Sequence, residues 1–227
     1  AAIKGSEGKT VHLVMRRGRE TYERDVEKGR IEVHMVESRM MEGQIGYVGI
    51  SQFTAHVPGE FRKAYEKLLA EGMKGLVIDL RSNPGGLMDS VVDTLNIFMP
   101  EGLLVYTEDR AGKRVEYSCE GASPIQIPLV VLVNGNSASA SEIFAGAVQD
   151  YGVGTLVGTV TFGKGIVQKT YTLRDGSAVK MTAAYYYTPK GSCIHGKGIQ
   201  PDVEVEPKED AEEDVQLQRA AELCREK

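Results

Sequence analysis

PLVVLVNGNSASASEIFAGAVQDYG, residues 128–152, carries the clearest indication of the fold. Its first seven residues form a nearly continuous apolar run, which is typical of a short strand buried on both faces of a sheet. A loop of small residues follows, and EIFAGAVQDYG (142–152) predicts a helix that ends at Gly152. A buried strand that leads through a tight loop into a helix indicates an α/β layered domain.

The same arrangement occurs earlier in the chain. GLVIDL (75–80) is another buried-strand pattern, and the loop RSNPGG (81–86) leads from it into a predicted helix over 87–98. An acidic stretch, 208–214, is expected to be a solvated hinge. The remaining predicted elements are helices over 58–72 and 215–224 and strands over 10–16, 46–53, 103–108, 113–118, 155–160, 166–173, 178–188 and 202–207.

Composition excludes several classes of protein. The chain has 227 residues, 27 of them basic and 32 acidic, for a net charge of −5, which argues against a general nucleic-acid binder. No run of about 18 apolar residues is present, so no membrane span is predicted. Cys119, Cys193 and Cys224 lie too far apart for a zinc site or a disulfide framework, and at most one disulfide bond could join them.

The loop NGNSASASE (134–142) holds the first candidate for chemistry. Ser139 lies three residues before Glu142, which is the capping-box pattern, so Ser139 could simply cap the helix. A serine at a helix N-terminus could also be a nucleophile, because the free N–H groups there would hold a developing oxyanion. The two roles are compatible, and the loop alone does not choose between them.

The loop TFGKGIVQ (161–168) holds the second candidate. A lysine acts as a general base only when neutral, so the pKa of Lys164 would have to fall from about 10.4 to about 7–8 through desolvation. Gln168 is four residues further on, and its amide oxygen could accept a hydrogen bond from the amine if both side chains share one face of a strand. The alternative is an ordinary exposed lysine in a glycine turn.

Two glycine-rich features need separate interpretations. Gly158, Gly163 and Lys164 match most of a phosphate-binding loop, but Gly165 replaces the required serine or threonine and a strand follows, so no nucleotide site is predicted. The glycines of RSNPGG (81–86) could let a backbone N–H approach a ligand closely, as a second oxyanion donor, or could form an ordinary turn.

Taken together, five motifs resemble one family. They run in family order from about residue 44 to residue 205: DLRSNPGG, NGNSASASEIFAGAVQDYG, TFGKGIVQ, DGSAVKMTAAYYYTPKG and GKGIQPDV. The chain resembles the C-terminal processing peptidases, also called tail-specific proteases, which are serine endopeptidases with a Ser–Lys dyad. This resemblance favours the catalytic interpretation of the serine and lysine loops.

The resemblance implies a role for individual residues. Ser139 matches the nucleophile, Lys164 the general base and Gln168 the residue that orients this lysine. The oxyanion hole would use the amide after the serine and one glycine of the NPGG loop, hence Ala140 together with Gly85 or Gly86. Three more positions match supporting residues of the family: Glu142, Asp150 and Thr161. Neither a metal nor an organic cofactor is implied.

The resemblance also implies a fold. Family members have a layered core of mixed sheets and helices, similar to the crotonase and Clp protease superfamily, with a PDZ domain inserted before it. Only the last part of a PDZ domain is recognisable here. The expected segments are a PDZ remnant over 1–19, a connecting or cap segment over 20–43, the protease core over 44–206, and an acidic hinge with a C-terminal helix over 207–227.

The implied function is cleavage of peptide bonds near the C-terminus of protein substrates, through an acyl-enzyme. The expected partners are proteins or peptides bound by their C-terminal region, and not nucleic acids or nucleotides; a homo-oligomer is left open. Family members generally work outside the cytoplasm, and we expect the same here, although AAIKGSEGKT (1–10) contains no signal peptide. The rival interpretations are a non-catalytic or autoinhibited peptide-binding fragment and an acyl-CoA enzyme of the crotonase type.

Overall fold

The computed structural model describes residues 8–29, 33–207 and 213–226, and the chain divides into two compact units, residues 1–34 and 35–227. In the first unit β1 (Thr10–Arg17) pairs antiparallel with β2 (Glu20–Glu27). The strand predicted over 10–16 is therefore confirmed. β2 lies in the stretch interpreted as a connecting or cap segment, and was missed because most of its side chains are charged and exposed.

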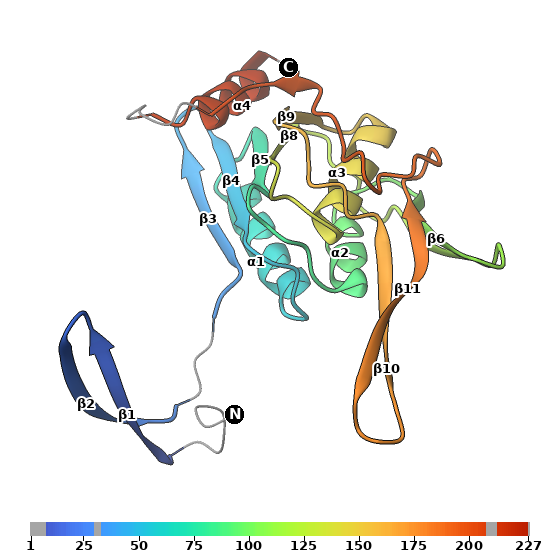
Figure 1. Cartoon of the computed structure of the whole chain (residues 1–227). Coiled ribbons are helices and arrows are strands. Elements are labelled where there is room, and N and C mark those ends of the chain that lie inside the picture. Colours follow the sequence, from blue (N-terminus) through green and yellow to red (C-terminus); the bar gives the residue numbers. More distant parts are fainter. Residues whose placement is uncertain (1–7, 30–32, 208–212, 227) are drawn as a thin grey trace. The chain divides into compact units, whose positions relative to one another are not determined.

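A six-stranded sheet forms the centre of the second unit (Figure 1). Its order is β12-β9-β8-β5-β4-β3, and every neighbouring pair is parallel except β3 with β4. β5 and β8 are buried along their whole length, as their apolar runs predict. The strands are β3 (Val36–Met41), β4 (Ile45–Ile50), β5 (Gly75–Asp79), β8 (Leu129–Val133), β9 (Thr155–Gly158) and β12 (Val203–Glu204).

Helices cover both faces of this sheet, which explains the continuous apolar runs. Alternate residues of β8 belong to two separate hydrophobic clusters, one shared with helices α1, α2 and α3 and the other with α4. The ring of Phe98, which lies three residues after the end of α2, packs against Phe61 of α1 and Phe144 of α3, with centroids 5.9 and 5.7 Å apart. The four predicted helices are confirmed, with ends shifted by up to three residues: α1 (Val57–Ala70), α2 (Met88–Leu95), α3 (Ala140–Tyr151) and α4 (Val215–Glu226).

A second, antiparallel sheet of four strands has the order β10-β11-β6-β7. Two of its strands, β10 and β11, continue beyond the core as a two-stranded ribbon (Figure 1). The strand that follows Lys164 is confirmed as β10, so the glycine–lysine loop does not open a helix as a phosphate-binding loop would. The strands are β6 (Gly102–Asp109), β7 (Arg114–Cys119), β10 (Ile166–Thr172) and β11 (Ala178–Tyr187).

The three cysteines are free thiols: Cys119 and Cys224 are buried and Cys193 is half-buried. Among the described residues, no group of three or more His, Cys, Asp or Glu side chains is placed to hold a metal ion. In the same part of the chain, every helix is too short or too polar to cross a membrane.

The architecture of the second unit is a mixed α/β fold with one largely parallel and one antiparallel sheet.

Candidate active site

Ser139 lies at the turn between β8 and α3, as the cap of the helix. Its backbone has φ of 57° and ψ of −115°, a conformation that strains any residue with a side chain. The predicted capping box is present, and the Ser139 N–H donates to Oε2 of Glu142 at 2.9 Å. Ser139 lines a pocket of about 310 Å³. A strained turn therefore brings this serine to the edge of a cavity.

The neighbouring serines of the same loop have structural partners instead. Ser137 is fully buried, and its hydroxyl donates to the carbonyl of Leu80 at 2.8 Å. Ser141 is also fully buried, and its hydroxyl donates to the carbonyl of Asn83 at 3.0 Å. These two side chains attach the start of α3 to the loop after β5, which leaves Ser139 as the serine of this loop that meets the pocket.

The glycine loop after β5 lies directly against this turn. Gly85 has a φ of +100°, and a Cβ atom there would lie 2.8 Å from the amide nitrogen of Ala140, so no side chain fits. The Gly85 N–H donates to Oδ1 of Asn83 at 2.8 Å. By contrast, the N–H groups of Gly86 and Ala140 have no acceptor in the described part of the chain. Both residues line the pocket with Ser139, so two backbone donors are available there.

Glu142 joins the serine loop to the lysine loop. Its side chain is fully buried at the start of α3. Besides the Ser139 N–H, the carboxylate accepts the Thr161 hydroxyl at 2.6 Å and the N–H groups of Gly163 at 2.7 Å and Lys164 at 2.9 Å. Four donors match the acceptor capacity of a carboxylate, and they hold both loops in one arrangement.

The other two predicted supporting residues lie in different places. Thr161 belongs to the Glu142 network, since its Oγ1 also accepts the N–H of Ile199 at 2.7 Å. Asp150 does not reach the pocket, because it is eleven residues after Ser139 in the chain, about 16 Å along the helix at 1.5 Å per residue. Its carboxylate accepts the N–H of Lys190 at 2.7 Å, beside the turn that follows β11.

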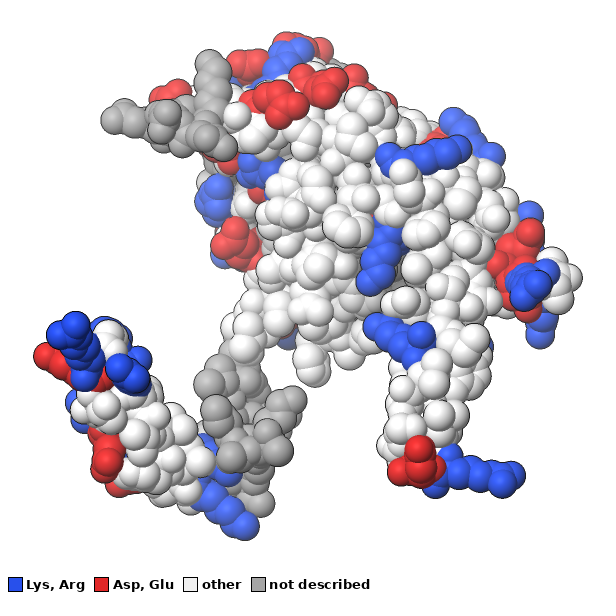
Figure 2. Space-filling view, in the orientation of Figure 1, with Lys and Arg blue, Asp and Glu red and all other residues white. Residues whose placement is uncertain are grey.

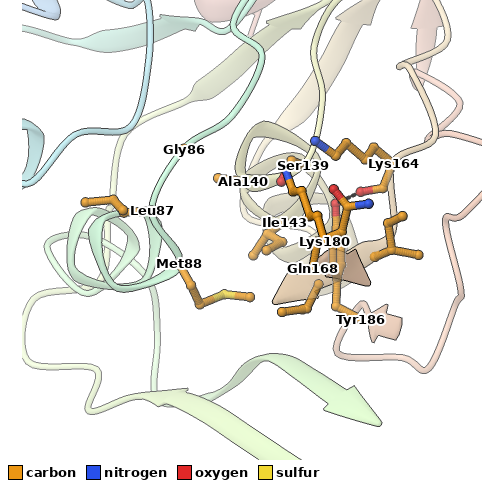
Figure 3. A pocket seen from close by; sticks show the side chains of 12 residues that line it. Gly86, Leu87, Met88, Ser139, Ala140, Ile143, Lys164, Gln168, Lys180 and Tyr186 are labelled. Atoms are coloured by element: carbon orange, nitrogen blue, oxygen red, sulfur yellow. Dashed lines mark hydrogen bonds between the residues drawn. The ribbon is translucent and has the colours of Figure 1, made fainter. Parts of the chain in front are cut away.

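Lys164 and Gln168 line the same pocket as Ser139 (Figure 3). Lys164 is half-buried in the loop before β10, and Gln168 is exposed on the strand itself. The register of β10 against β11 shifts between Val167 and Gln168, and such a bulge turns the following side chain to a new direction. Within the described residues, no hydrogen bond joins the Lys164 ammonium to Ser139 or to Gln168, so the predicted orienting contact stays a prediction.

Two residues of β11 complete the pocket, and the sequence patterns do not reveal them. The buried Tyr186 donates its hydroxyl to the carbonyl of Lys164. Burial raises the pKa of Tyr186 above its ordinary value, and so does the charge of Glu142, while hydrogen bonding with Ser139 opposes part of this change. Tyr186 is therefore a neutral donor beside the serine. The second residue is Lys180, an exposed lysine on β11, the strand that pairs with the Gln168 strand β10.

Comparison with known proteins places these residues in context. The family model described as Peptidase family S41 matches residues 44–205. A carboxyl-terminal-processing protease of Synechocystis sp. is 44% identical over 162 residues, which cover 71% of this chain and 38% of that protein. A probable CtpA-like serine protease of Staphylococcus aureus is 38% identical over 208 residues, which cover 90% of this chain and 42% of the relative.

A solved structure is similar as well. The photosystem II D1 C-terminal processing protease superposes with a TM-score of 0.73 at 32% identity, and the match covers 97% of this chain and 60% of that one. The chain spans about two fifths of the length of the curated relatives that it matches. Its mixed α/β fold, its motifs and its family match agree: this chain belongs to peptidase family S41, a family of serine peptidases, and is a homologue of the C-terminal processing proteases.

Proposed function

We propose that this chain carries the catalytic core of a serine endopeptidase that cleaves protein substrates near their C-terminus, with Ser139 and Lys164 as a catalytic dyad. One observation carries the proposal: the strained Ser139 lines one pocket with Lys164 and with two backbone N–H groups that lack acceptors in the described part of the chain. A nucleophile, a base and oxyanion donors around one cavity are the parts that acyl transfer needs.

The chemistry follows from these groups. The neutral amine of Lys164 takes the proton of the Ser139 hydroxyl as the serine oxygen attacks the peptide carbonyl carbon. The carbonyl oxygen becomes an oxyanion, which accepts hydrogen bonds from the N–H groups of Gly86 and Ala140 at the positive end of α3. Lys164 then protonates the departing amine, which leaves an acyl-enzyme. A water that gives its proton to Lys164 attacks the ester carbonyl, and Lys164 passes this proton to the Ser139 oxygen as the ester bond breaks and the acid is released.

Hydrogen bonding favours Gly86 over Gly85 as the second oxyanion donor. The N–H of Gly85 already donates to Asn83, whereas that of Gly86 has no acceptor among the described residues. Gly85 contributes by having no side chain, because a Cβ atom there would clash with the amide of Ala140. The two glycines would therefore serve one oxyanion hole in different ways.

The remaining predicted residues act through these groups. Glu142 and Thr161 would be positioning residues that keep the serine and lysine loops together. Gln168 would orient the Lys164 amine from β10 once a substrate excludes water from the pocket. Asp150 would support the turn after β11 rather than the reacting atoms.

Several further expectations belong to the same proposal. The core, residues 44–206, would have the layered fold of the crotonase and Clp protease superfamily, and residues 1–19 would correspond to the last part of a PDZ domain. Substrates would be proteins that bind through their C-terminal region. The protein would work outside the cytoplasm, as members of this family generally do. The structure divides the chain between residues 34 and 35. The predicted boundaries at 19/20 and 43/44 differ from this division and remain predictions.

The test is cleavage of β-casein, which is naturally unfolded, followed by intact-mass analysis. The unmodified chain should remove C-terminal fragments, and Ser139→Ala and Lys164→Ala should each abolish cleavage without loss of the folded circular-dichroism spectrum. Lys169→Ala, at an exposed lysine outside the pocket, is the matched control and should retain activity. Near-normal cleavage by Lys164→Ala would contradict the dyad.

The pH dependence of the same cleavage gives a second test. A lysine base works only after it loses its proton, so the rate should rise with pH and then level. A rate that stays flat from about pH 5 to pH 9 would contradict a lysine base. If the unmodified chain binds peptide but never cleaves it, the chain is a non-catalytic binding fragment instead.

A further inference from the structure

Lys180 has no role in the mechanism above, yet it lines the proposed catalytic pocket. Together with Lys164 it supplies the charged side chains of the lining, which contains no Asp or Glu. Within the described residues Lys180 forms no ion pair and no hydrogen bond through its ammonium group. A chain with a net charge of −5 thus places two cations at one cavity, and neither ammonium group has an ion-pair partner in the described part of the chain.

The pairing of β10 with β11 explains how Lys180 reaches the pocket. After the bulge, Gln168 lies opposite Thr182 and Thr170 lies opposite Lys180. Residues opposite each other, or two apart along a strand, share one face of a sheet, so Gln168 and Lys180 lie on the same face of the ribbon. Figure 3 shows both side chains pointing toward the end of the pocket that holds Ser139.

The surroundings favour a negative ligand at this position. In Figure 2, Lys and Arg side chains without neighbouring Asp or Glu side chains lie over the base of the β10–β11 ribbon. The carboxylate of Glu142 does not line the pocket and forms no ion pair with Lys180 within the described residues; its four hydrogen-bond donors belong to the serine and lysine loops. An anion brought by a ligand would therefore meet Lys180 without competition from a carboxylate of the lining.

A peptide substrate offers one kind of anion. Its carboxylates are the terminal α-carboxylate and the side chains of Asp and Glu, and each can accept charge-assisted hydrogen bonds from an ammonium group. A peptide that fills the pocket also displaces water, which strengthens such a contact. Both observations, the unpartnered cation and its position beside the nucleophile, point to a carboxylate close to the scissile bond.

We propose that Lys180 is a specificity-determining residue that binds a carboxylate of the peptide substrate next to the bond that Ser139 attacks. This inference rests on the proposed function, since it names the substrate chemistry of the same site. It makes Lys180 a substrate-binding residue and leaves the proton transfers to Lys164. The carboxylate comes from the chain terminus or from an acidic side chain, and the experiment separates these two sources.

The experiment uses quenched fluorescent peptides that span the bond cleaved in β-casein. One pair differs only in a free C-terminal carboxylate or its amide, and a second pair differs only in Glu or Gln beside the bond. For the unmodified chain, kcat/KM should be about tenfold higher for the acid in at least one pair. The pair that shows the preference identifies the source of the carboxylate.

Variants then locate the preference. Lys180→Met keeps a long side chain without the charge. It should reduce the ratio of kcat/KM for the acidic peptide to kcat/KM for its neutral partner toward one. Lys180→Arg should retain most of the preference, and so should the control Lys169→Met, whose side chain lies outside the pocket. A ratio that Lys180→Met leaves unchanged, or a ratio near one for both pairs with the unmodified chain, would overturn the inference.

A binding measurement separates this inference from the proposed function. Fluorescein-labelled peptides with the C-terminal residues of β-casein are prepared as the free acid and as the amide. Each is titrated with the Ser139→Ala variant and with the double variant Ser139→Ala/Lys180→Met. A preference for the acid that Lys180→Met removes would support carboxylate recognition even where the unmodified chain cleaves nothing. Cleavage that depends on Ser139 and Lys164, with no effect of Lys180→Met on either ratio, would leave the proposed function standing and reject the role of Lys180.

Discussion

The pocket is built by two regions that differ in how firmly they are held. The β8–α3 region is buried, and its residues Ser139 and Glu142 have backbone and side-chain partners within the core. The β10–β11 ribbon is largely exposed, and it carries Gln168 and Lys180 without comparable partners. The proposed nucleophile thus belongs to the rigid region, whereas the residues proposed to orient Lys164 and to bind the substrate belong to the region with fewer restraints.

The largest effect is expected in the glycine loop after β5, which packs directly against the rigid region. Gly86 has φ of +151°, and a Cβ atom there would collide with the carbonyl oxygen of Phe53, so Gly86→Ala must displace the proposed oxyanion donor. We expect kcat/KM to fall by about 10²–10³-fold, as when an oxyanion donor is lost. Gly59→Ala is the control: it lies in α1 with open space around it and should leave cleavage unchanged. Cleavage by Gly86→Ala within threefold of normal would exclude this donor.

The next effect is expected at the carboxylate that joins the two loops. The carboxylate of Glu142 accepts four hydrogen bonds, two at each oxygen. In Glu142→Gln an NH₂ group replaces one of these oxygens, so two of the donors lose their acceptor. The free energy of unfolding should fall by about 2–4 kcal/mol, because buried polar groups lose their partners. Urea denaturation measures this change, with the exposed Glu66→Gln as control. A change below about 0.5 kcal/mol would show that the network does not stabilise the core.

A smaller effect is expected at the hydrogen bond between Tyr186 of β11 and the loop that carries Lys164. Tyr186→Phe removes the hydroxyl that donates to the carbonyl of Lys164 but keeps the buried ring. Stability should fall by about 1 kcal/mol, the usual contribution of one hydrogen bond, and cleavage should slow by up to about tenfold. Tyr185→Phe, whose ring is 42% exposed, is the matched control for both measurements. Equal effects of the two variants would assign the tyrosine hydroxyl no special role.

The smallest effect on stability is expected on the ribbon itself. Gln168→Ala should change the free energy of unfolding by less than about 0.5 kcal/mol, because Gln168 is exposed. It should nevertheless lower kcat several-fold if the amide orients Lys164. Thr170→Ala, on the same strand face but outside the pocket, should change neither quantity. A large loss of stability in Gln168→Ala would contradict the contrast between the two regions.

Sequence patterns predict the rigid region much better than the ribbon. β5, β8 and α3 follow from apolar runs and a capping box, because burial on both faces leaves little freedom in the choice of residues. β2 and β3 were missed because charged and apolar residues mix along them. The positions of Lys180 and Tyr186 depend on a bulged strand register, which no local pattern encodes.

The candidate site shows the same limit. The NPGG loop is visible in the sequence, but the choice between its glycines depends on the side chain of Asn83, which occupies one of the two N–H groups. Asp150 matches a family position, and the length of the predicted helix already separates it from Ser139, but no local pattern reveals its contact with the N–H of Lys190. Contacts between distant segments, rather than local propensity, decide these points.

The backbone of Ser139 has an evolutionary consequence. A φ of 57° with ψ of −115° is disfavoured for serine by about 1–3 kcal/mol, whereas glycine adopts it without a clash. If Ser139 is the nucleophile, as proposed, its replacement by glycine would remove the activity while relieving the backbone strain. Stability and the proposed activity would then oppose each other at this one residue: selection for stability alone would tend to remove the serine, and only selection for turnover would retain it.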